Sequence, residues 1–277
     1  MINLNPKRRS KGETVQISIS RLRAYQLCPQ RYYFRYILQA EDEFISSNLF
    51  FGSAIHHAIA AFHQSQNTIG SNGMYREFLK YWQAVIEDCN QKQKSIRYKA
   101  NPEELRDKAY GLCVEYTAAF KDIVASSTDD VELMFECPLF CPESGFGSFE
   151  HTLVGKIDLV ANGCVYEFKT ASRTSSQKDA DSSIQLTAYA LAYRYLYDQP
   201  PDHLFIVNLV KTKKPKIVKL ETHRVQRDFG NLIDMATSIA RAIENDIFYR
   251  NRETQWGCAN CEHEKKCLGF RPQEVKE

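Results

Sequence analysis

The sequence contains no apolar run of the roughly 18 residues that a membrane span needs, and its first 16 residues include no hydrophobic stretch resembling a signal peptide. It also has little net charge, only +2, because 36 lysines and arginines nearly balance 34 aspartates and glutamates. These absences predict a cytoplasmic protein without a membrane partner. Binding to a polyanion such as DNA would then depend on local basic patches rather than on a global field.

The composition also excludes disordered and fibrous proteins, because 43% of the residues are hydrophobic and 25% are charged, as in ordinary globular proteins. A chain of 277 residues can bury a real core, as one large domain or as one domain with a helical insertion. There are nine cysteines. Without an export signal, they indicate reduced thiols or metal ligands rather than disulfides.

The first half of the chain is expected to be helical. Residues 1–17 are basic and poor in apolar side chains, so they are expected to form a flexible arm. A helical region follows over 18–130, in which no alternation typical of strands is visible. Within 47–126 we expect three helices, with breaks at 69–73 and near 101–102.

A core of strands and helices is expected over 131–250, where alternating and β-branched residues first appear. Its expected elements are strands within 131–170, a helix over about 179–197, strands near 203–210 and 216–220, and a helix over about 225–248. The tail, 251–277, is too short and too rich in cysteine to build its own core. The fold class is therefore α/β, with a central mixed sheet.

The dipeptide Asn162-Gly163 is a strong signal for a two-residue hairpin turn. Such a turn places Asp158 directly opposite Glu167, with Cβ atoms roughly 4.5–5.5 Å apart, and Lys169 on the same face. Opposed like charges destabilise a sheet unless something compensates them, and Mg²⁺ would do so because it prefers hard oxygen ligands. A metal there would lower the pKa of a bound water, while Lys169 orients or deprotonates that water or holds a phosphate.

Two alternatives stay open for this hairpin. Asp158 and Glu167 could be solvated charges on an exposed sheet face, with Lys156 and Lys169 as neighbours. A β-bulge would also shift the register on which the opposition of the two carboxylates depends.

The segments Gly155-Lys156-Ile157-Asp158 and Glu167-Phe168-Lys169-Thr170 resemble the core of PD-(D/E)XK nucleases of the RecB-like branch. The resemblance implies a restriction-endonuclease-like α/β core that cleaves DNA with Mg²⁺ or Mn²⁺. It also implies that Asp158, Glu167 and the backbone carbonyl of Phe168 bind the metal, and that Lys169 is catalytic.

Two further motifs are similar to the same branch. Gly52-Ser53-Ala54-Ile55-His56 resembles its upstream helix, which implies that His56 is a metal ligand. Adjacent helical residues point about 100° apart, so only one of His56 and His57 can face the site. Gln185 and Tyr189, four residues apart on one helix face, resemble the Q-x-x-x-Y element, which positions DNA and the active-site lysine.

Near the end of the sequence, Cys258, Cys261 and Cys267 form a C-x₂-C-x₅-C pattern typical of metal or cluster binding. The fourth ligand is expected to be the distant Cys28, and His263 is the alternative. This arrangement resembles the iron-sulfur members of the branch, which implies a C-terminal [4Fe-4S] lobe. Zinc stays open because four cysteines suit it equally. The remaining five cysteines are expected to be ordinary thiols.

The resemblance implies a DNA exonuclease acting on single strands or ends, in repair, recombination, or phage- or CRISPR-related processing. Lys213 and Lys214, in the basic run 211–216, are candidate DNA contacts. A non-catalytic DNA-end-binding subunit is one alternative, although the intact carboxylates and lysine oppose it. A nuclease that works only with a helicase, recombination or CRISPR adaptation partner is the other. The sequence is compatible with all three.

Overall fold

The structure is a computed structural model that describes residues 16–141, 145–253 and 258–269. Its centre is a six-stranded mixed sheet in which one long strand, β5, pairs with three others. The strands of this sheet are β1 (Gln16–Ile17), β4 (Val131–Cys141), β5 (Phe146–Ala161), β6 (Cys164–Ala171), β7 (His203–Val210) and β8 (Lys216–Thr222). The central mixed sheet predicted from the sequence is therefore present.

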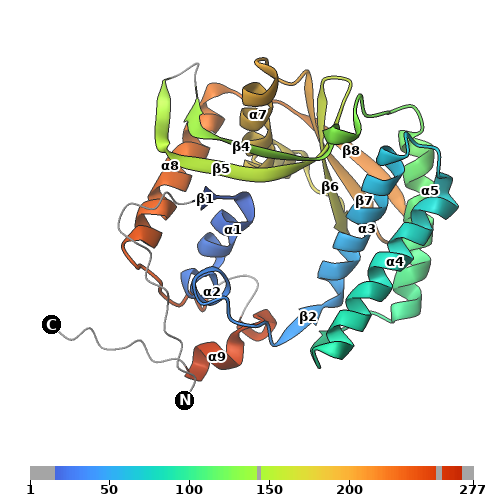
Figure 1. The fold of residues 1–277 in the computed structure, drawn as a ribbon, viewed down its shortest axis with the longest axis horizontal. Coiled ribbons are helices and arrows are strands. Elements are labelled where there is room, and N and C mark those ends of the chain that lie inside the picture. Colours follow the sequence, from blue (N-terminus) through green and yellow to red (C-terminus); the bar gives the residue numbers. More distant parts are fainter. Residues whose placement is uncertain (1–15, 142–144, 254–257, 270–277) are drawn as a thin grey trace.

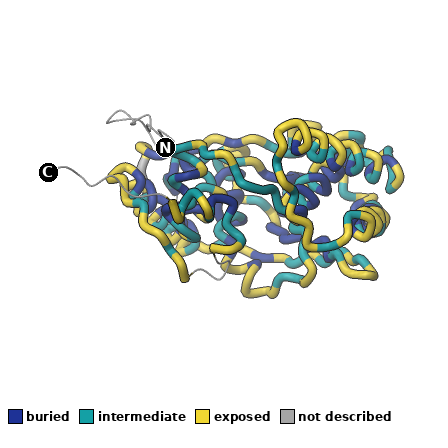
Figure 2. Tube along the Cα trace, turned by 90° about the horizontal axis from the view of Figure 1, so that it is seen from below, coloured by how far each residue is buried: buried dark blue, intermediate teal, exposed yellow. Residues whose placement is uncertain are grey.

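Helices cover both faces of the sheet, so the fold has three layers (Figure 1). One face packs against α1 (Ile19–Leu27), α7 (Ile184–Tyr197) and α8 (Gln226–Glu244), and the other against α3 (Ser47–Gln64), α4 (Gly70–Gln91) and α5 (Pro102–Phe120). In β7, Leu204 and Ile206 enter the first core, whereas Phe205 and Val207 enter the second. Figure 2 shows the buried segments running through the interior between these layers.

The order of pairing in the sheet places β6 between β5 and β7. β5 pairs antiparallel with β4 and β6, β6 pairs parallel with β7, and β7 pairs antiparallel with β8. The parallel pair is joined through α6 (Gln177–Asp181) and α7. The carboxyl ends of β6 and β7 therefore lie at the same edge of the sheet.

The turn between β5 and β6 has the conformation that its sequence predicts. Asn162 and Gly163 both have positive φ, 51° and 72°, as the two central residues of a type I′ turn require. The register is also as predicted, because Leu159 pairs with Tyr166 and Ala161 with Cys164. Asp158 and Glu167 follow immediately beyond the last paired position.

Several boundaries differ from the sequence-based expectations. The three helices expected within 47–126 are present as α3, α4 and α5, but this stretch, which shows no strand-like alternation, also contains β3 (Ser95–Arg97), which pairs in parallel with β2 (Phe44–Ser46). Three residues are too few to display an alternating pattern. The helix expected over about 179–197 is divided, because Ser183 caps the start of α7 by accepting a hydrogen bond from Leu186 N.

The end of one helix and the end of the N-terminal arm also differ from the sequence-based expectations. The helix expected to reach residue 248 stops at Glu244, which leaves Ile247 about half exposed. Gln16 and Ile17, the last residues of the expected basic arm, form β1 and pair with Thr152 and Leu153. The rest of that arm lies outside the described residues. None of the described helices is long and apolar enough to cross a membrane.

Candidate functional site

Three elements bring His56, Asp158 and Glu167 together: α3, β5 and β6. Helix α3 comes close to the end of β6 at Gly52, where an added Cβ would lie 3.1 Å from Thr170 Oγ1. A glycine suits this position because an added β-carbon would crowd the Thr170 side chain. His56 follows about one helical turn later on the same helix, so the close approach carries its ring toward the hairpin.

Asp158 is the best anchored carboxylate of the group. Its side chain is buried, and its Oδ2 accepts a hydrogen bond of 2.8 Å from the backbone N–H of Phe168. Its Oδ1 lies 3.5 Å from His56 Nδ1. The neighbouring His57 points elsewhere, with its Nε2 3.7 Å from Glu77 Oε2. The structure therefore brings His56, and not His57, to the hairpin.

Glu167 is also buried and is held from α7. Gln185 Nε2 donates to Glu167 Oε2 at 2.8 Å and to Tyr189 Oη at 2.9 Å, so the two residues of the Q-x-x-x-Y element meet at this carboxylate. Arg23, which lies on helix α1, donates a hydrogen bond of 2.8 Å from its Nη1 to Gln185 Oε1. Sequence reasoning missed Arg23, because no local pattern connects it with a glutamine 162 residues later.

The electrostatics of the site are typical of a place that binds cations. Burial, and then the charge of Asp158, raises the pKa of Glu167 to about 8. Burial lowers the pKa of Lys169, although Glu167 and Asp158 oppose this effect. Burial alone would also lower the pKa of His56, but its hydrogen bond to Asp158 and the nearby carboxylate charges leave it raised. The buried Glu167, whose charge is disfavoured by burial and by Asp158, would gain from a bound cation.

A possible metal-ligand group at this place includes a residue that sequence reasoning missed. Among the described residues, ligand atoms of His56, Glu132 and Asp158 all lie within 4.8 Å of one another. Glu167 is not in that group; its carboxylate is held by Gln185 instead. One imidazole nitrogen with carboxylate oxygens suits a divalent ion such as Mn²⁺ or Mg²⁺. Glu132 carries no motif signal, because it is one of many strand glutamates.

The four cysteines predicted as ligands lie around one cavity of about 50 Å³, at the opposite end of α1 from β1. Cys28 caps the C-terminal end of α1, and Cys258, Cys261 and Cys267 come from the tail. Burial raises the pKa of Cys261 to about 11. His263, the alternative ligand, lines the same cavity.

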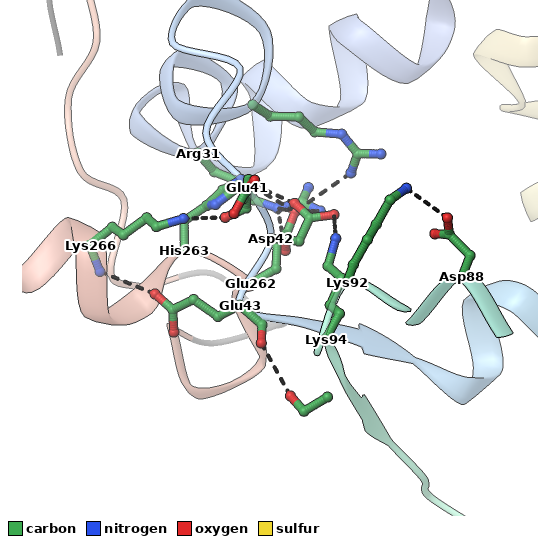
Figure 3. A network of polar contacts seen from close by, with 12 residues as sticks. Arg31, Glu41, Asp42, Glu43, Asp88, Lys92, Lys94, Glu262, His263 and Lys266 are labelled. Carbon is green, nitrogen blue, oxygen red and sulfur yellow. Dashed lines mark hydrogen bonds and ion pairs between the residues drawn. The ribbon is translucent and has the colours of Figure 1, made fainter. Parts of the chain in front are cut away.

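Polar contacts fix the tail against the body of the protein beside this cavity (Figure 3). Arg31 Nη2 lies 2.7 Å from Glu262 Oε1, and the backbone N–H of Glu43 donates to the carbonyl of Glu262 at 2.9 Å. The buried His263 has its Nε2 3.6 Å from Asp42 Oδ1. The two distant segments therefore meet through ion pairs as well as through the cysteines.

The lysine-rich turn follows β7 at the edge where β6 ends. Lys213 and Lys214 are exposed. Lys211, at the start of the turn, donates to Asn48 Oδ1 at 2.9 Å and lies over the ring of Phe51. These contacts join the turn to α3, the helix that carries His56.

Comparison with known proteins gives a family match and a structural neighbour. The PD-(D/E)XK nuclease superfamily matches residues 16–268. No curated protein matches the sequence. The fold is similar to the crystal structure of a Eubacterium rectale protein named "Putative exonuclease", with 13% sequence identity, a TM-score of 0.54, and coverage of 95% of this chain and 90% of that chain. At this identity, the likeness concerns the fold alone. The match over nearly the whole sequence shows that the chain belongs to the PD-(D/E)XK nuclease superfamily.

Proposed function

We propose that the protein is a Mg²⁺- or Mn²⁺-dependent deoxyribonuclease that hydrolyses phosphodiester bonds, as an exonuclease on single-stranded DNA or DNA ends. The observation that carries this proposal is the meeting of His56, Asp158 and Glu167 at the middle of β6, with Lys169 two residues further along that strand. The printed name of the structural neighbour supports exonuclease action.

Each residue has a proposed task. His56, Asp158, Glu167 and the Phe168 carbonyl would hold the ion, which when bound polarises the phosphate and lowers the pKa of an attacking water. Burial lowers the pKa of Lys169, which favours its exchange of a proton with that water.

Gln185 is a positioning residue in this proposal, because it touches the Glu167 carboxylate and orients it. Tyr189 shares the same amide nitrogen, so the pair fixes Glu167 from α7. Arg23 is held beside them by the hydrogen bond that one of its five guanidinium N–H groups donates to Gln185. The exposed Lys213 and Lys214 would extend the basic surface along the DNA strand.

The cysteine cavity is proposed to hold a [4Fe-4S] cluster. The four cysteines line one cavity, and their C-x₂-C-x₅-C pattern with a distant fourth cysteine resembles the iron-sulfur members of the nuclease family. Zinc is the alternative occupant, because four thiolates are equally its ligand set.

In terms of the chain, the proposal assigns three parts. The helical region 18–130 contributes Cys28 and His56, the nuclease core covers 131–250, and the tail 251–277 completes the cluster site. A helicase, recombination or CRISPR adaptation partner would fit a nuclease of this kind, and so would action alone.

The proposal is tested by a time course on end-labelled single- and double-stranded DNA with Mn²⁺ or with EDTA. We expect metal-dependent shortening from an end by the wild type. Asp158→Asn and Lys169→Met should lose cleavage but keep most DNA affinity, since phosphate contacts elsewhere supply it. Glu136→Gln, an exposed change on β4, is the matched control. Substantial metal-dependent cleavage by Asp158→Asn would refute the active site.

A further inference from the structure

Glu132 lies on β4 across the sheet from Asp158. The flanking pairs, Val131 with Leu159 and Leu133 with Ile157, are in register, so Glu132 occupies the position opposite Asp158. Its carboxylate oxygen lies within 4.8 Å of a ring nitrogen of His56 and of a carboxylate oxygen of Asp158. A third strand therefore contributes a ligand-type side chain to the site.

The backbone of Glu132 is unusual for a strand. Its φ is +57°, a left-handed conformation that is unfavourable for a residue with a β-carbon. The pairs on either side keep the same register, so no inserted residue accounts for it. Something in the native state must offset this conformation.

The Glu132 carboxylate forms an ion pair with Lys156 on the neighbouring strand β5. Lys156 is 46% exposed and Glu132 is 23% exposed in their side chains. A half-exposed ion pair contributes little to stability, so pairing with Lys156 is a weak reason to keep a strained glutamate. The ion pair holds the Glu132 carboxylate on the side of Lys156.

We propose that Glu132 is a further side-chain ligand of the divalent ion, binding it together with His56 and Asp158. This inference rests on the proposed function. Lys156 then competes with the ion for the carboxylate, so that metal binding exchanges one cationic partner for another. The left-handed backbone of Glu132 serves to aim its carboxylate at Asp158.

The test is Mn²⁺ binding to the full chain, measured by calorimetry without DNA. Glu132→Gln should weaken binding by at least about tenfold. Lys156→Met should bind Mn²⁺ as tightly as the wild type or more tightly, because a competing cation is gone. Glu136→Gln, on the same strand, should bind like the wild type. Equal affinity of Glu132→Gln and wild type would overturn the inference, and so would equal losses in Glu132→Gln and Lys156→Met.

A second variant separates metal binding from folding. Glu132→Gly relieves the left-handed conformation, so its metal-free melting temperature should match or exceed that of the wild type. Its rise in melting temperature on adding Mn²⁺ should be smaller, and an equal rise would overturn the inference. Asp158→Asn shows which proposal fails. If it loses Mn²⁺ while Glu132→Gln keeps wild-type affinity, only the inference falls; if the wild type binds no Mn²⁺, both fall.

Discussion

Replacing Glu167 with glutamine should stabilise the metal-free protein, and the gain should increase with pH. The carboxylate is buried beside Asp158, and these two causes raise its pKa from 4.5 to about 8. Glutamine has nearly the same shape but carries no proton to lose. Its amide oxygen can still accept the 2.8 Å hydrogen bond from Gln185 Nε2. The change therefore removes a titration while keeping the contact.

The sign and size of this gain in stability follow from the pKa values of Glu167 in the unfolded chain and in the folded protein. Between pH 4.5 and about 8, the folded protein keeps a proton that the unfolded chain has released. The proton kept by Glu167 therefore makes the free energy of unfolding of the wild type depend on pH. Its contribution is fully present below pH 4.5, and it is lost at about 1.4 kcal/mol per pH unit as the pH rises toward 8. The wild type should thus lose up to about 4 kcal/mol relative to Glu167→Gln by pH 7.5. For a domain of this size, each kcal/mol corresponds to about 2–4 °C in Tm.

The assay is a set of thermal melts in EDTA at pH 5, 6, 7 and 8, on wild type and Glu167→Gln handled anaerobically. Subtracting one variant from the other cancels the titration of distant groups. A difference in Tm that grows with pH supports the reasoning, and adding Mn²⁺ should then raise the wild type more than the variant. A constant difference, or one that shrinks as pH rises, would refute the assigned burial of an uncompensated carboxylate.

Three other perturbations address the cluster, the metal and the DNA surface. Cys28→Ser should bleach the visible absorption, lower Tm and reduce cleavage together, since joining segments about 230 residues apart is worth up to roughly 5 kcal/mol; unchanged colour and Tm would remove Cys28 from the ligand set. His56→Ala should weaken Mn²⁺ binding in calorimetry and His57→Ala should not, because only His56 contacts Asp158; the reverse order would exchange their roles. Changing Lys213 and Lys214 to glutamine should reduce the log-log salt slope of single-stranded DNA binding by about 0.7 for each lost phosphate contact, and an unchanged slope would make the turn a solvated one.

The fold was predictable where local signals are strong. Asn162-Gly163 predicted both the turn and the register of β5 with β6, because few residues tolerate two successive positive φ values. Periodicity located the long helices, but it could not reveal the break before Ser183, where a capping side chain interrupts an otherwise helical pattern. β2 and β3 are held by pairing between distant segments, for which three-residue strands carry no pattern.

The site was predictable only as far as its motifs extend. His56, Asp158 and Glu167 were found through their spacing and resemblance, and the structure places them together. Arg23 and Glu132 were missed because each reaches the site by long-range packing, from a helix and a strand without a motif. The local sequence predicts the turn between two strands, but it does not predict which side chains from distant segments contact the residues next to that turn.

The distance in sequence between Cys28 and the three tail cysteines that line the same cavity also sets an order of events during synthesis. At about 5–20 residues per second, a ribosome needs roughly 10–50 s to add the residues between Cys28 and Cys258. Helix α1 and its terminal cysteine must wait through that interval, while the strands of the sheet and the hairpin have already been made. The cysteine cavity can therefore close only after the segment through Cys267 has been translated. Because α1 also carries Arg23 to Gln185, one helix links the cysteine cavity with the glutamine that holds Glu167.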